Sequence, residues 1–131
     1  MNYKGVIIEE SLANKDILKD IKILKTEIEK VTPEHETPWI SQWTKHTVEI
    51  SEDQAKEIAN KISKSLDHNH GGSWYADFKN NSHHYIIFLN KFFYINRKNK
   101  EEYEEAGKYA LSLGIPEHQI INPEGEYNDT I

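Results

Sequence analysis

Residues 74–97 read WYADFKNNSHHYIIFLNKFFYINR, and this stretch decides the fold. It holds three runs rich in aromatic and β-branched residues, separated by two short polar segments. Asn80-Asn81 and Asn90-Lys91 suit two-residue turns, because asparagine tolerates a positive φ. The stretch therefore predicts a three-stranded antiparallel meander with strands at 74–79, 83–89 and 92–97.

The two turns fix a register for this meander. They place Asp77 opposite His84 and His84 opposite Arg97, so that the three side chains lie side by side on one face. Asp77 can hold one tautomer of His84, and Arg97 can bind a carboxylate or phosphate with two parallel hydrogen bonds. Tyr75 lies in the next row of the same face. The alternative is a ladder of cross-strand ion pairs that only stabilises the sheet.

Further elements flank the meander on both sides. Val6-Ile7-Ile8 is apolar on both strand faces, which is typical of a central strand. Residues 21–31 mostly alternate between apolar and charged side chains, as in a half-exposed antiparallel strand. Ser51 and Gln54 form a capping-box pattern, and apolar residues at helical spacing follow it. A second capping-box pattern, also followed by apolar residues at helical spacing, begins near Asn99. The predicted outer elements are strands at 3–9, 21–31 and 43–50 and helices at 51–67 and 99–113.

The predicted order is therefore strand-strand-strand-helix-strand-strand-strand-helix. It indicates a single α+β domain over residues 1–122, with a mainly antiparallel sheet and both helices packed on one face. Residues 123–131 are acidic and lack periodicity, and we expect a mobile tail there.

Composition excludes several classes of protein. The chain has 131 residues, a net charge of −6 and no cysteine. Disulfides, thiolate catalysis and cysteine-based metal sites are therefore excluded, and the acidic balance argues against nucleic-acid binding. No run approaches the ~20 apolar residues of a membrane span, and no signal peptide is visible, so we expect a cytoplasmic protein.

Other histidines and tryptophans are further candidates for a site. His46 shares a strand face with Val48. We expect it to be either a buried, hydrogen-bonded structural histidine or a residue that lines a cleft. Trp43 and Trp74 can form the walls of a pocket. His68 and His70 lie at metal-ligand spacing, although their position beside two glycines is more typical of a solvated loop than of a metal site.

The chain resembles a family of small uncharacterised prokaryotic proteins. The residues that carry the resemblance are 37–39 (TPW), 42–50 (QWTKHTVEI), 73–80 (SWYADFKN), 84–88 (HYIIF) and 112–116 (SLGIP). It covers nearly all of the chain except the tail, and it implies no activity, cofactor or partner.

The sequence favours a non-enzymatic binding domain with a pocket borne on the sheet. Its expected occupant is a small anionic ligand or a protein segment, with no cofactor. Asp77, His84 and Arg97 would anchor it, and Tyr75, Trp74, Trp43 and His46 would surround it. Two alternatives stay open: a metal-dependent hydrolase that uses His68 and His70, and a subunit of a larger complex, including a homodimer.

Overall fold

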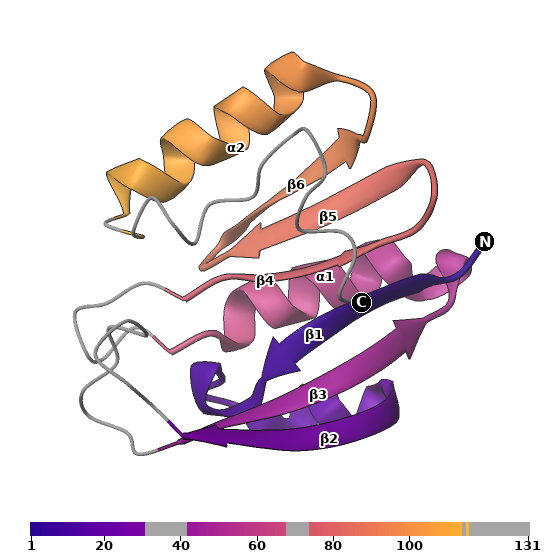
Figure 1. Cartoon of the computed structure of the whole chain (residues 1–131), viewed down its shortest axis with the longest axis vertical. Helices are drawn as coiled ribbons and strands as arrows, with labels where there is room; N and C mark the ends of the chain where they lie inside the picture. The colour runs from indigo at the N-terminus through magenta and orange to yellow at the C-terminus, as the bar shows by residue number, and fades with distance from the viewer. Residues whose placement is uncertain (31–41, 68–73, 114, 116–131) are drawn as a thin grey trace.

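The computed structural model describes residues 1–30, 42–67, 74–113 and 115 and contains one antiparallel sheet (Figure 1). The strands are β1 (Tyr3–Ile8), β2 (Lys22–Lys30), β3 (Gln42–Ile50), β4 (Ala76–Lys79), β5 (His83–Phe88) and β6 (Lys91–Asn96). The helices are α1 (Ala55–Ser65) and α2 (Lys100–Ser112), with short 3₁₀ turns η1 (Glu9–Ser11), η2 (Lys15–Asp20) and η4 (Glu52–Gln54). Neither α-helix of the described residues is long and apolar enough to cross a membrane.

The strands lie in the order β2-β3-β1-β4-β5-β6, and every neighbouring pair is antiparallel. The α+β class, the antiparallel sheet and the predicted order of elements are confirmed. β1 lies between β3 and β4, as its two apolar faces predicted. The expected tail at 123–131 lies outside the described residues.

The two helices cover opposite faces of the sheet, so the prediction that both pack on one face is wrong in this respect. Side chains of a strand alternate between faces. In β5, Tyr85 and Ile87 belong to the core that α1 covers, whereas Ile86 and Phe88 belong to a second core beneath α2. In Figure 1, α1 passes behind β4 and β1.

The register of the meander differs from the predicted one by two residues in each hairpin. Asn80 N–H donates to the carbonyl of His83 at 3.0 Å, so the first turn is centred on Asn81-Ser82. The second turn is centred on Leu89-Asn90, and Asn90 has the positive φ (62°) that asparagine tolerates. Moving a two-residue turn by one position changes each pairing by two residues, which keeps every side chain on its predicted face.

Candidate functional site

A buried hydrogen-bonded network joins β4, β5 and α2. Asp77 pairs across the sheet with Ile86, which places its side chain diagonally beside His84. His84 Nε2 lies 2.7 Å from Asp77 Oδ2, and His84 Nδ1 lies 3.0 Å from Tyr103 Oη. His84 has no exposed surface, and Asp77 is 7% exposed. The predicted proximity of Asp77 and His84 is therefore present, with Tyr103 as a third member.

Arg97 closes the network at its outer end. It is half-buried directly after β6, and its Nη1 donates to the carbonyl oxygen of Asn80 at 2.7 Å. Its positive charge also lies close enough to the hydroxyl of Tyr103 to act on that phenol. Burial raises the pKa of Tyr103, and the nearby positive charge of Arg97 partly opposes that rise. Tyr103 is therefore a neutral phenol at physiological pH and keeps its proton.

One arrangement of protons satisfies the contacts that join His84, Asp77 and Tyr103. His84 donates from Nε2 to the carboxylate of Asp77 and accepts at Nδ1 the proton of Tyr103. The oxygen of Tyr103 then lies near the positive charge of Arg97. The network thus runs from a half-exposed cation to a buried anion, and within it both ring nitrogens of His84 and the hydroxyl of Tyr103 are hydrogen-bonded.

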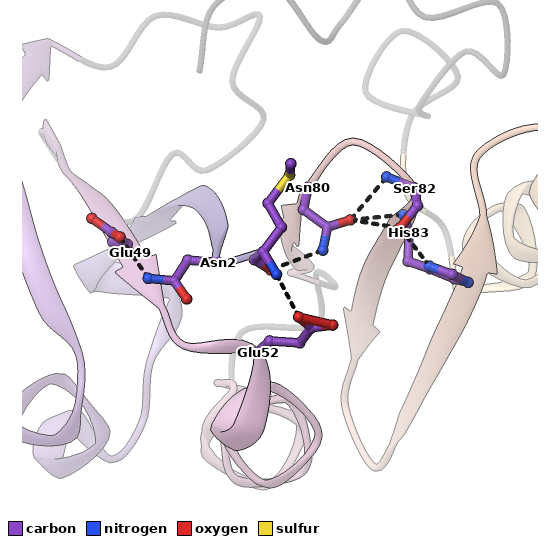
Figure 2. Close-up of polar contacts among 7 residues, drawn as sticks. Asn2, Glu49, Glu52, Asn80, Ser82 and His83 are labelled. Atoms are coloured by element: carbon purple, nitrogen blue, oxygen red, sulfur yellow. Dashed lines mark hydrogen bonds and ion pairs between the residues drawn. The ribbon is translucent and has the colours of Figure 1, made fainter.

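The side chain of Asn80 organises the turn between β4 and β5 (Figure 2). The Asn80 side-chain oxygen accepts from the backbone N–H groups of Ser82 at 3.0 Å and His83 at 2.9 Å. Its Nδ2 donates to the carbonyl of Met1 at 3.1 Å, and the amino group of Met1 pairs with Glu52. Because its backbone and side chain are both engaged, Asn80 presents its carbonyl to Arg97 in a fixed direction.

A narrow apolar recess lies beside this network, between α2 and the sheet. Its volume is about 10 Å³, roughly the room for one water molecule. Burial raises the pKa of Tyr75, which lines this recess, and the charge of Asp77 adds to the effect. The lining residues are Tyr75, Ile86, Phe88, Tyr103, Ala106, Gly107 and Ala110.

The two tryptophans expected to form pocket walls lie elsewhere. Trp43 and Trp74 contact each other, with ring centroids 5.7 Å apart. Both pack with the core cluster on the α1 side, whereas Asp77 and His84 lie under α2. The structure therefore brings together Asp77, His84, Arg97 and Tyr75 and separates them from the tryptophans.

His46 belongs to a third place, where β2, β3 and η1 meet. Its Nδ1 lies 2.8 Å from Thr26 Oγ1, and its Nε2 lies 2.9 Å from Glu9 Oε1. The hydrogen bond from His46 holds the pKa of Glu9 below its usual value; burial opposes this, and Lys15 at 3.5 Å adds to it. His46 is thus a fully hydrogen-bonded histidine of the sheet.

We expect the Glu9 interaction to make stability sensitive to acid. Because the folded pKa of Glu9 is lowered, its contribution is complete above the ordinary value of 4.5 and is lost as the pH falls through the folded value. Urea unfolding from pH 6 to pH 3 should therefore show a smaller loss for Glu9→Gln than for the wild type. Glu104→Gln, at an exposed position of α2, is the control and should follow the wild type. Equal acid sensitivity of Glu9→Gln and the wild type would contradict this assignment.

Sequence reasoning missed two members of these networks, Tyr103 and Glu9. Helical spacing with Ala106 and Ala110 indicates that Tyr103 lies on the inner face of its helix, but its contact with His84 depends on which face of the sheet α2 covers. His68 and His70 lie outside the described residues. Within the described ranges, no group of three or more His, Asp and Glu side chains is arranged to hold a metal ion.

Comparisons with protein-family models, curated proteins and solved structures found no match for this chain.

Proposed function

We propose that this protein is a binding domain for a small ligand that carries a carboxylate or phosphate group, with Arg97 as its anchor. The observation that carries the proposal is the orientation of the Arg97 guanidinium by the Asn80 carbonyl, with the Tyr103 hydroxyl nearby. A guanidinium has five N–H donors, so the contact with Asn80 leaves donors for an anion. In the described part of the chain, no carboxylate forms an ion pair with Arg97.

The rest of the network supports binding rather than catalysis by His84. A general base must reach the proton that it removes, but His84 is fully buried and both ring nitrogens are engaged. His84 and Asp77 instead act through Tyr103, because they fix the direction of its hydroxyl. A donor group held in place before binding loses less entropy when the ligand arrives.

The test is a titration of ¹⁵N-labelled protein with inorganic phosphate and with acetate, observed at the Arg97 side-chain Nε–H. We expect a saturable shift in the wild type and at least about tenfold weaker binding for Arg97→Gln, because a charged hydrogen-bond pair contributes about 1.5–3 kcal/mol. Arg97→Lys should fall between the two, since lysine keeps the charge but lacks the planar fork.

Two further variants separate this site from nonspecific attraction. Lys98→Gln removes an exposed positive charge next to Arg97 and should leave binding unchanged. Tyr103→Phe keeps the ring but removes the hydroxyl that lies beside the positive charge of Arg97, and should weaken binding several-fold. A wild type without a saturable shift, or a loss in Lys98→Gln equal to that in Arg97→Gln, would refute the proposal.

A further inference from the structure

β2 forms one edge of the sheet and is unusually open (Figure 1). All nine of its residues are exposed, and among the described residues no strand pairs with its outer side. An edge strand of this length offers a row of backbone N–H and C=O groups that can pair with another chain.

The side chains of β2 divide by face. Thr26 pairs with His46 and Ile28 with Thr44, so both lie on the α1 face, and alternation places Leu24 with them. Leu24 is 43% exposed and Ile28 is 66% exposed. The opposite face carries Lys25 and Glu27, which form an ion pair at 3.1 Å.

This strand is complementary to itself in one antiparallel register. If Thr26 lies opposite its own copy, Lys25 faces Glu27 of the partner subunit, and Leu24 faces Ile28 of the partner subunit. Each pair occurs twice because of the two-fold symmetry. Opposite charges meet on one face and apolar side chains on the other, and both kinds of cross-strand pair are stabilising.

The two neighbouring symmetrical registers each put like charges opposite each other on the two-fold axis, although an axis at Glu27 also brings Lys25 opposite Glu29 of the partner subunit. A two-fold axis at Glu27 places that carboxylate against its own copy, and an axis at Lys25 does the same for two ammonium groups. Like charges directly opposite each other are destabilising. A β-bulge lies between Ile23 and Lys25, and it brings Ile23 to the α1 face beside Leu24. The apolar surface available to the second copy is enlarged in this way.

We propose that two copies of this chain associate through β2 in this register, which joins their sheets into one. The proposal is independent of the anion site, since β2 and β6 lie at opposite ends of the sheet. It predicts a dimer whose stability depends on the alternating charges of Lys25 and Glu27.

The first experiment measures the mass of the full chain by sedimentation over a range of micromolar concentrations. We expect a dimer in the wild type and a monomer for Lys25→Glu, which places carboxylates opposite each other. The double variant Lys25→Glu/Glu27→Lys exchanges the two charges and should restore the dimer. Both side chains are about 60% exposed, so circular dichroism should show unchanged folding in all three proteins. A monomeric wild type, or a Lys25→Glu variant that remains a dimer, would overturn the proposal.

A second experiment tests the register itself. The chain has no cysteine, so a single introduced thiol reports only on its own neighbours. Thr26→Cys should form an intersubunit disulfide on mild oxidation, because directly opposite strand residues have Cβ atoms about 4.5–5.5 Å apart and a small shift brings them into the disulfide range of about 3.5–4.5 Å. Ile28 is also exposed, but Ile28→Cys lies four residues from its own copy in this register and should cross-link at least about tenfold more slowly. Equal cross-linking by the two variants would overturn the Thr26 register.

Discussion

Replacing Asp77 by alanine is expected to lower the free energy of unfolding by about 3 kcal/mol. Asp77 is almost fully buried and accepts from His84 Nε2 at 2.7 Å. Without the carboxylate, the N–H of a side chain with no exposed surface has lost its acceptor. Breaking a buried pair from one side is costly for this reason, whatever the pair contributes as a whole. Urea unfolding at pH 7 measures the change.

Three comparisons separate loss of the pair from loss of a side chain. Asp77→Asn keeps an oxygen acceptor of the same shape and should cost about 1 kcal/mol. Asp53→Ala removes an exposed aspartate and should change stability by at most about 0.5 kcal/mol. Asp77→Ala combined with His84→Leu should cost less than the sum of the single variants by about 1 kcal/mol or more. Additive effects would contradict a coupled pair.

The side-chain faces of this site could be predicted, but its exact pairing could not. Two side chains of one strand lie on the same face when their positions differ by an even number. A two-residue change of register therefore leaves every side chain on its predicted face. Asp77 and His84 therefore meet although Ile86, and not His84, lies directly opposite Asp77. The turn could be centred on Asn80-Asn81 or on Asn81-Ser82. The side-chain hydrogen bonds of Asn80 select the second centre, and local sequence rules do not predict those hydrogen bonds.

The placement of α2 had a signal in the sequence. Tyr85-Ile86-Ile87-Phe88 is a continuous apolar run, and such a run is typical of a strand that is buried on both faces. The same argument applied to Val6-Ile7-Ile8 correctly indicated a central strand. With both faces of β5 buried, the two helices had to lie on opposite sides of the sheet.

Contacts between elements far apart in the chain were beyond prediction from one sequence. The hydroxyl of Tyr103 reaches His84 only once α2 has docked, and the carboxylate of Glu9 reaches His46 only through the turn after β1. Periodicity places a side chain on a face but does not say which polar atom it meets there.

Gly5→Ala is expected to have an effect at least as large as that of Asp77→Ala. Gly5 lies in the middle of β1, between Val48 on β3 and Phe78 on β4. A Cβ at this position would stand 2.1 Å from the carbonyl oxygen of Asp77 and 2.8 Å from Cα and Cβ of Phe78. None of these atoms can move away by rotation of a side chain, so β4 must separate from β1 or β1 must twist.

The sign of the change in the free energy of unfolding distinguishes a close contact at Gly5 from an ordinary Gly→Ala substitution. Where the backbone conformation and the space allow it, Gly→Ala stabilises a protein by about 0.4–1 kcal/mol because it restricts the unfolded chain. At Gly5 we expect a loss of about 3 kcal/mol or more, measured by urea unfolding, and a melting temperature lower by roughly 10 °C. Phe78→Ala should not rescue Gly5→Ala, since the contacts are with backbone atoms and with a Cβ that alanine retains. A more stable Gly5→Ala protein would mean that β1 and β4 are not as close as their register requires.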